Sequence, residues 1–186
     1  MATFTITFHG PFHVGSGVPD QGLDRVLDPG ALLPGTSLKG AMRAAARETL
    51  GLPERVVAPV FGGTVEIDGK VRRLPSPWAW SDADLTGVNL QNLARIRIND
   101  KTRTTERGFL MLGESVWAES GTFTVEQHGE LHRDLQEHLL VLRAAARAVT
   151  GIGGGRRRGE GWVSITDDNG WTAGDTSALR KLGGPA

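Results

Sequence analysis

The sequence contains no cysteine, and this absence excludes several kinds of chemistry. Without thiols the chain can form no disulfide, offers no thiolate nucleophile and cannot build a cysteine-based zinc site. It also has no apolar run of the roughly 20 residues that a transmembrane helix requires. The first residues, MATFTITFHG, alternate apolar and polar side chains, whereas a secretory signal carries a basic stretch before an apolar block. We therefore expect a cytoplasmic protein with no signal peptide and no membrane partner.

An excess of charge of either sign is absent too. Lysine and arginine total 21 residues, aspartate and glutamate also total 21, and the net charge is 0. The whole-chain charge therefore does not point to a polyanionic partner, but its distribution is uneven. Basic residues concentrate in three groups: Lys39, Arg43 and Arg47; the stretch from Arg95 to Arg107; and Arg156 to Arg158. If folding brings these groups together, they form one basic face.

Aromatic residues are few, at 6% of the chain, and tyrosine is absent. This composition argues against a platform of aromatic side chains on which RNA bases stack. We expect core or strand-face positions for the tryptophans, namely Trp78, Trp80, Trp117, Trp162 and Trp171. The Walker nucleotide-binding motif, the HExxH zinc motif and the GxSxG nucleophile motif are missing as well.

Hydrophobic periodicity predicts a single domain for the 186 residues. Alternation of Phe4, Ile6 and Phe8, for example, indicates a strand with one buried face. The predicted order is strand, helix, strand, strand, helix and strand, at residues 3–9, 36–51, 109–119, 122–127, about 130–149 and 161–166. This is the β-α-β-β-α-β order of the ferredoxin-like fold, in the α+β class.

Two less regular regions interrupt this order. Residues 10–35 are rich in glycine and proline and predict a long loop, a kind of segment that often carries function. Residues 52–107 fall between the first helix and the second predicted core strand, so we interpret them as one inserted region. Within it we expect an extended segment ending in VVAPVFGG, a hairpin about Asp68-Gly69, and a strand at WAWSDADL.

The densest positive charge directly follows the most flexible backbone, in GIGGGRRRGEGW at residues 151–162. Glycine has no Cβ, so successive glycine N–H groups can approach a ligand closely and form an anion-binding concavity. Arginine adds planar donors that suit phosphate. The candidate residues are Gly153, Gly154, Gly155, Arg156, Arg157 and Arg158. A flexible surface connection with solvated arginines is the alternative interpretation.

A second candidate site lies at the predicted start of the first helix, in PGTSLKG at residues 34–40. The N–H groups of a first helical turn lack internal partners, and the helix dipole favours an anion there. Thr36 and Ser37 supply hydroxyl donors, and Lys39 adds a positive charge. Alternatively, Thr36 only caps its own helix and Lys39 is solvated. Combined with the glycine–arginine segment, this helix start predicts one phosphate-binding cradle.

Four motifs lie in order along the chain. They are FHVGSG at residues 12–17, LLPGTSLKGAMRAAAR at residues 32–47, RINDKTRTTERGFLMLGESV at residues 97–116 and GIGGGRRRGEGWV at residues 151–163. Together they resemble the RAMP superfamily of CRISPR-associated proteins, and most closely the backbone subunits of type III effector complexes. Those subunits line up along a guide RNA and face the target RNA.

The resemblance implies a ferredoxin-like core with a thumb, here residues 52–107, that displaces a nucleotide from the base stack. It implies guide RNA, target RNA and other subunits, including copies of this chain, as partners. It also implies that guide-RNA phosphates bind Ser37, Lys39, Arg43 and the loop at residues 153–159. From the basic stretch that begins at Arg95 we add Arg97, Lys101 and Arg103 as RNA-binding candidates. Phosphate contacts suit a protein that must accept any guide sequence, because they position RNA without reading it.

The resemblance further implies that an aspartate in the loop after the first strand supports metal-dependent cutting of target RNA. We assign this role to Asp24, in DQGLDRVLDPG at residues 20–30. A carboxylate can hold Mg²⁺ or another divalent cation, which neutralises charge as a 2′-hydroxyl attacks its own phosphate. One carboxylate is a weak metal site, so the RNA must supply the other ligands. Alternatively Asp24 is a turn residue; Asp20 and Asp28 compete with it, and Asp28 precedes proline like a turn former.

Two other functions stay open. One is a capping subunit of the same complex that binds RNA without cutting it. The other is a metal-independent endoribonuclease that processes guide RNA with His13 as general base, a role that the histidine pKa suits. We interpret His13 as a loop or packing residue instead. Surface positions are expected for His9, His128, His132 and His138.

Overall fold

The computed structural model describes residues 1–15, 26–67 and 69–184. Its largest sheet is antiparallel and contains β1 (Ala2–Phe8), β4 (Trp78–Trp80), β5 (Asp84–Thr86), β8 (Ser120–Gln127) and β9 (Val163–Asp167). The strand order is β4-β8-β1-β9, and β4 and β5 pair with successive segments of β8. Helices combined with antiparallel sheets confirm the expected α+β class.

The centre of this sheet follows the predicted alternation in β1. Phe4, Ile6 and Phe8 are buried as predicted. Ile6 lies opposite Gly121 of β8 on one side and opposite Ile165 of β9 on the other. Because side chains of a strand alternate between faces, these three apolar residues form one buried face of the sheet.

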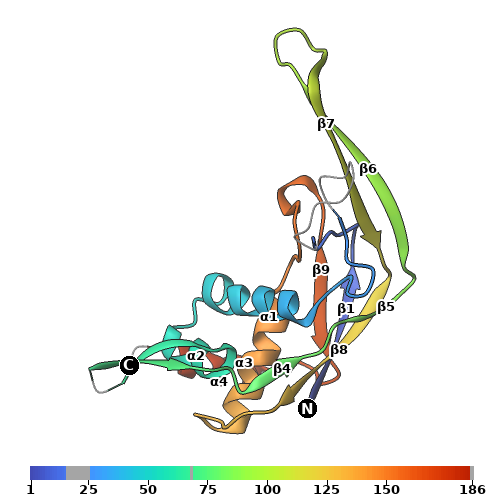
Figure 1. The fold of residues 1–186 in the computed structure, drawn as a ribbon. Helices are drawn as coiled ribbons and strands as arrows, with labels where there is room; N and C mark the ends of the chain where they lie inside the picture. The colour runs from blue at the N-terminus through green and yellow to red at the C-terminus, as the bar shows by residue number, and fades with distance from the viewer. Residues whose placement is uncertain (16–25, 68, 185–186) are drawn as a thin grey trace.

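Helices pack on one side of the sheet (Figure 1). They are α1 (Gly35–Ala44), which continues as the π-helical turn η1 (Ala45–Thr49), α2 (Glu54–Phe61), α3 (Leu135–Ala148) and α4 (Ala173–Gly183). Leu38 and Met42 of α1 and Leu142 of α3 are fully buried in the core. A short 3₁₀ helix, η2 (Arg156–Arg158), lies in the connection from α3 to β9. The described part of the chain contains no helix that is long and apolar enough to cross a membrane.

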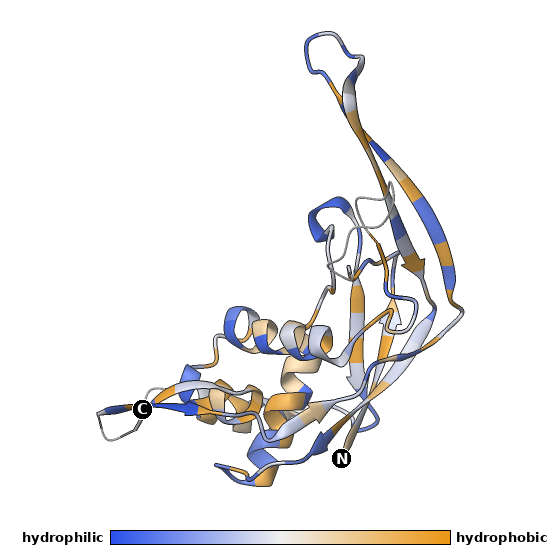
Figure 2. Cartoon of the chain, viewed as in Figure 1, coloured by the Kyte–Doolittle hydropathy of each residue, from blue (hydrophilic) through white to orange (hydrophobic). Residues whose placement is uncertain are grey.

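Two hairpins extend from this core (Figure 1). The first joins β2 (Gly63–Ile67) to β3 (Lys70–Leu74), which confirms the hairpin predicted from Asp68-Gly69. The second, which we call the arm, joins β6 (Asn89–Ile98) to β7 (Thr105–Trp117) and points away from the sheet. Hydrophobic and hydrophilic segments alternate along the arm (Figure 2). Its β7 strand is also tied to the core, because Phe12 and Val116 exchange two backbone hydrogen bonds of 2.8 Å.

The arm corrects the prediction of a core strand at residues 109–119. These residues belong to β7, which pairs with β6, and the place beside β8 is taken by β4 and β5 instead. The apolar run at Phe109 to Leu112 suggested a buried strand, but Phe109 is 50% and Leu110 60% exposed. Residues 52–107 therefore contain two strands of the main sheet in addition to hairpin segments.

Three predictions about segments that form helices, or lie at their ends, were also wrong in detail. VVAPVF belongs to α2 and not to an extended segment, because burial of Val56, Val57 and Val60 stabilises a short helix. Thr36 is not the N-cap of α1: the helix begins at Gly35, whose N–H donates to the Asp82 carboxylate at 2.7 Å. The helix expected from about residue 130 begins at Leu135, after the Asp134 side chain accepts a hydrogen bond from the Gln136 N–H.

His138 was predicted at the surface but is fully buried on α3. Its Nδ1 accepts a hydrogen bond of 2.9 Å from the indole N–H of Trp78 on β4. Burial lowers the pKa of His138 below its ordinary value of 6.5, and the nearby Arg133 lowers it further. The neutral ring thus joins α3 to β4. Trp78 itself is buried, as predicted.

The C-terminal helix α4, which was not predicted, is held by an ion-pair network. Asp167, at the end of β9, accepts hydrogen bonds from Arg143 at 2.7 Å and from Arg147, both on α3. Arg143 reaches on to Asp175 in the first turn of α4 at 3.3 Å. Both guanidinium groups also lie over the ring of Trp171. Burial alone would raise the pKa of Asp167, but its hydrogen bonds to Arg147 and Arg143 lower it below 3.8.

Replacing Asp167 should therefore destabilise the fold. The side chain of Asp167 is only 5% exposed, so Asp167→Asn leaves Arg147 without its carboxylate partner and Arg143 with Asp175 alone, and should cost about 3–5 kcal/mol in the free energy of unfolding. Asp167 has a lowered pKa in the fold, so its contribution is complete above the unfolded pKa and is lost as the pH falls through the folded pKa. Urea titrations of both proteins at pH 7 and below pH 4 should show the difference shrinking in acid. Asp168→Asn, at the exposed neighbouring residue, is the matched control; an equal loss in that variant would contradict the assignment.

Candidate nucleic-acid interface

The glycine–arginine loop, residues 151–161, has a defined shape. Its backbone is fixed to the segment that follows β1: the Gly154 N–H donates to the His13 carbonyl at 2.9 Å, and the Gly161 N–H to the Pro11 carbonyl at 2.7 Å. The Ile152 N–H closes the base of the loop on the Gly161 carbonyl at 2.8 Å. These bonds show that the loop is anchored to its neighbours and is not a flexible connection.

The glycines permit this shape. Gly153 has φ +67° and Gly161 has φ +74°, a left-handed conformation that glycine adopts without strain. A Cβ atom on Gly153 would collide with the His13 carbonyl, and one on Gly161 with the Ile152 carbonyl. The flexible backbone therefore lies beside the arginines because only glycine lets the loop pack this tightly on its neighbours.

The three arginines of the loop point to solvent. Arg156, Arg157 and Arg158 are all exposed, and within the described residues none of them forms an ion pair. Glu160, two residues after Arg158, is only 4% exposed and pairs with Arg95 of β6. The three arginines of the loop are thus exposed, while Glu160 of the same loop holds Arg95 of the arm beside them.

These residues surround a depression that we call the loop hollow, with a volume of about 710 Å³. It is lined by His13 to Gly15, Arg95, Met111 and Gly153 to Arg158. A second hollow of about 710 Å³ adjoins it on the arm and shares Arg95, Met111 and Arg158 with it. Two of the three basic groups seen in the sequence therefore meet here.

The start of α1 does not join this hollow. Lys39 and Arg43 line a separate depression, which we call the helix hollow, and its lining has no residue in common with that of the loop hollow. The N–H of Gly35 is taken by Asp82, and the N–H of Ser37 donates to the Pro34 carbonyl at 3.0 Å. An anion at the α1 terminus would thus meet a carboxylate that already lies there.

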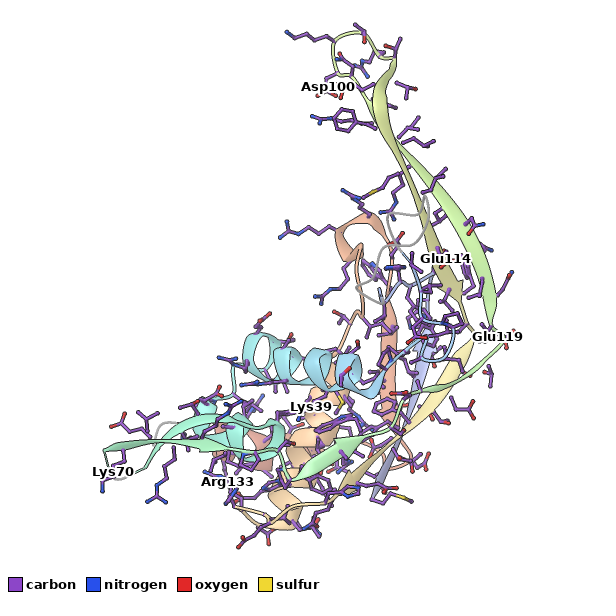
Figure 3. All side chains as sticks on the ribbon, in the orientation of Figure 1. Lys39, Lys70, Asp100, Glu114, Glu119 and Arg133 are labelled. Atoms are coloured by element: carbon purple, nitrogen blue, oxygen red, sulfur yellow. The ribbon has the colours of Figure 1, made fainter. Side chains whose placement is uncertain are left out.

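Lys39 lies between α1 and the β4 strand (Figure 3). Its ammonium group is 5.2 Å from the ring centroid of Trp80, within range of a cation–π contact. Burial lowers the pKa of Lys39 below its ordinary value of 10.5, and the charge of Arg43 lowers it further. A nearby anion would stabilise the charged form of Lys39 and raise its pKa again.

Two further predicted RNA-binding residues, Lys101 and Arg103, lie in the turn between β6 and β7 next to Asp100, which Figure 3 labels at the far end of the arm. Arg97 pairs with Glu106 at 3.3 Å and lies 5.0 Å from the centroid of Phe109. The backbone of Arg103 has φ +58°, and its N–H donates to the Asn99 carbonyl. The Lys101 side chain is exposed. Arg97, on β6, lines the second hollow together with Arg158, so the structure places this residue beside the glycine–arginine loop.

His13 is a packing residue, as expected. It is only 5% exposed, and its Nδ1 lies 2.8 Å from the backbone carbonyl of Glu114 on β7. The side chain of Glu114 in turn accepts a hydrogen bond from the Leu27 N–H at 3.0 Å. The segments before and after residues 16–25 are therefore both fixed on β7.

Asp20 and Asp24 lie outside the described residues. On either side, Gly15 and Leu27 form an antiparallel bridge, and Gly15 lines the loop hollow. Asp28 accepts a hydrogen bond from the Gly30 N–H at 2.9 Å, which confirms it as a turn former. Residues 1–15, 26–67 and 69–184 contain no group of three His, Asp or Glu side chains that could hold a metal.

The sequence analysis missed the two acidic residues that organise these sites, Glu160 and Asp82. The only signal for Glu160 was its position between Gly159 and Gly161, since an acidic residue in a basic loop needs a counterion. Asp82 had no local signal, because its partner Gly35 lies 47 positions away in the chain.

Comparison with known proteins agrees with the motif-based resemblance. The model of the RAMP superfamily matches residues 5–164, whereas no curated protein matches the chain. Among solved structures, a chain of the type III-B Cmr-beta complex in the apo state has a TM-score of 0.68 and 15% identity, over 90% of this chain and 97% of that one. A chain of Cmr-beta bound to cognate target RNA has a TM-score of 0.67 and 13% identity, over 89% and 96%. At these identities the similarity is one of fold.

The glycine–arginine loop yields a direct test. Gly153→Ala should destabilise the protein by about 1–3 kcal/mol more than Gly159→Ala, because both positions have positive φ but only Gly153 has a carbonyl in the way. Differential scanning calorimetry of both variants measures the difference. Equal losses would mean that the backbone conformation alone, and not packing on His13, selects glycine here.

Proposed function

The chain belongs to the RAMP superfamily, and on this premise we propose that it is a guide-RNA-binding subunit of a type III CRISPR ribonucleoprotein. The observation that carries the proposal is the loop hollow, where three exposed arginines and Arg95 gather in a chain of net charge 0. Exposed guanidinium groups without carboxylate partners, beside glycine backbone, suit the phosphates of a nucleic acid. Lys39 and Arg43 continue the RNA contact at the helix hollow, and we assign Ser37, in the first turn of α1, to the same RNA.

Within this proposal the core is ferredoxin-like. β1, α1, β4 with β5, β8, α3 and β9 take the six positions of the β-α-β-β-α-β order, and the sheet order β4-β8-β1-β9 is compatible with this assignment. The arm then corresponds to the thumb, with Lys101 and Arg103 in its turn and Arg97 on β6 in reach of RNA. We propose that the arm is the element that separates bases of the RNA. It begins inside the region 52–107 and continues beyond it to Trp117.

The partners follow from the same reasoning. The solved structures with this fold are chains of type III-B Cmr-beta complexes, one of them bound to cognate target RNA. We therefore propose that this chain assembles with other subunits, including copies of itself, around a guide RNA that pairs with a target. Backbone contacts at the loop hollow leave the bases of the guide free to pair.

Cleavage of the target is a further part of the proposal, with Asp24 as the catalytic residue. Mg²⁺ or another divalent cation fits this site only if the RNA supplies most of its ligands, because the described residues contain no ready metal cluster. Such a cation, when bound, neutralises charge on the phosphate under attack. Gly15, the last described residue before the segment that contains Asp24, lines the loop hollow. A capping subunit would share the RNA site and lack this cleavage.

RNA binding is tested at the loop. Arg157→Gln should weaken binding to guides of unrelated sequence by similar factors and reduce the slope of log affinity against log salt by about 0.7 for one lost phosphate contact on single-stranded RNA. Fluorescence anisotropy over a series of salt concentrations measures both quantities. Arg180→Gln, at an exposed arginine of α4, is the control and should change neither. A guide-dependent loss would contradict phosphate recognition.

Cleavage is tested in the assembled complex. Asp24→Asn should abolish cutting of target RNA and leave its binding intact, whereas Asp28→Asn should cut normally because Asp28 only forms a turn. EDTA should stop the wild-type reaction. Unchanged cutting by Asp24→Asn would reject this residue as catalytic, and EDTA-resistant cutting of guide precursor that His13→Ala abolishes would favour the processing enzyme.

A further inference from the structure

The helix hollow has a volume of about 910 Å³ and lies apart from the loop hollow. Three structural units enclose it: α1 with η1, α2, and the β2–β3 hairpin. Its charged and polar lining includes Lys39, Arg43 and Arg47 from the first unit, Glu54 from α2, and Thr64 and Arg73 from the hairpin. Four basic groups thus share a single lining carboxylate.

Two arginines share the Glu54 carboxylate. Glu54 Oε1 lies 3.4 Å from Arg43 and Oε2 lies 3.2 Å from Arg47. Both separations exceed those of a strong charge-assisted hydrogen bond, which is shorter than about 2.9 Å. The Nε of Arg43 is also buried and has no hydrogen-bond acceptor among the described residues. The guanidinium donors here therefore outnumber their acceptors.

The backbone of β2 closes on this ion pair. A Cβ atom on Gly63 would lie 2.6 Å from Glu54 Oε1 and 3.2 Å from a terminal nitrogen of Arg43. Arg73 faces the same hollow from β3, where it lies opposite Thr64, and within the described residues it has no ion pair. The glycine allows β2 to pack against Glu54, and Arg73 shares the lining of the hollow with that carboxylate.

We propose that the helix hollow is a second phosphate site, formed by Arg43, Arg47 and Arg73, in which Glu54 holds the arginines until a phosphate displaces it. Phosphate offers several acceptor oxygens to donors that now share one carboxylate, and arginine binds it through two parallel hydrogen bonds. The volume suits a nucleotide-sized group. The phosphate belongs either to the RNA backbone or to a free nucleotide, since both present the same chemistry.

This inference rests on the proposed function where it uses Lys39 and Arg43, which were already assigned to RNA. It adds Arg47, Arg73 and Glu54 to the proposed site. It also divides the RNA contact into two sites, and a substitution in one of them should leave binding at the other intact. Lys39 supports it, because its lowered pKa reflects burial near Arg43 without a compensating anion. A bound phosphate would supply that anion.

The test uses two opposite substitutions in the intact chain. Arg73→Gln, at an exposed residue, should weaken binding of a mixed-sequence single-stranded RNA about tenfold, as expected for the loss of one charge-assisted hydrogen bond. Glu54→Gln removes the competing carboxylate and should tighten binding about two- to fivefold. Arg72→Gln is the matched control, because Arg72 neighbours Arg73 on β3 but does not line the hollow.

Isothermal titration with the RNA and, separately, with adenosine monophosphate identifies the source of the phosphate. Nucleotide binding that Arg73→Gln removes assigns the site to a free nucleotide, whereas effects on RNA alone assign it to the backbone. If neither Arg73→Gln nor Glu54→Gln changes the binding of either probe, or if the wild type binds neither, the second site is rejected. Loss in Arg157→Gln with no change in Arg73→Gln rejects this inference alone, and the reverse rejects the proposed site in the loop hollow alone.

Discussion

The buried ion pair between Glu160 and Arg95 links the parts of the molecule on which the proposed function depends. Glu160 comes from the glycine–arginine loop and Arg95 from β6 of the arm, so the pair fixes the arm beside the loop. Burying a carboxylate costs free energy unless a cation pairs with it. Glu160 therefore requires a basic partner, and Arg95 of β6 supplies it. Gly155 contributes to the fit, because a Cβ atom there would strike the Glu160 side chain.

Local charge separation gives a chain of net charge 0 a surface with exposed positive charge, as the proposed RNA contact requires. Acidic residues are placed where they organise basic ones: Glu160 orients Arg95, Glu54 holds Arg43 and Arg47, and Asp167 holds two arginines of α3. The arginines of the loop, by contrast, keep their charge exposed. Total charge therefore does not describe this surface, and the distribution of paired and unpaired arginines describes it better.

Local patterns predicted the elements whose environment is encoded in neighbouring residues. The alternation in β1, the β2–β3 hairpin and the position of the glycine–arginine loop between α3 and β9 were predicted correctly in this way. The apolar run of β7 was placed in the core because periodicity does not distinguish a buried strand from an exposed arm. His138 was misplaced because its partner, Trp78, lies 60 positions away.

The same limit applies to the candidate site. Residue types pointed to the arginines and glycines of the loop, since their chemistry is intrinsic. The division into two hollows depends on the sheet, which carries the loop and the start of α1 to different places, and no short segment encodes that geometry. Asp82 at the start of α1 likewise depends on how β4 and β5 pair with β8.

The anchoring of the glycine–arginine loop on Pro11 and His13 has a consequence for kinetics. A loop that already holds its shape gives up little conformational entropy when RNA arrives, so more of the contact energy remains as affinity. Association is then governed by diffusional encounter with an attractive field and not by a slow folding step. On the proposed function, a guide strand therefore binds this preformed surface without waiting for the loop to fold.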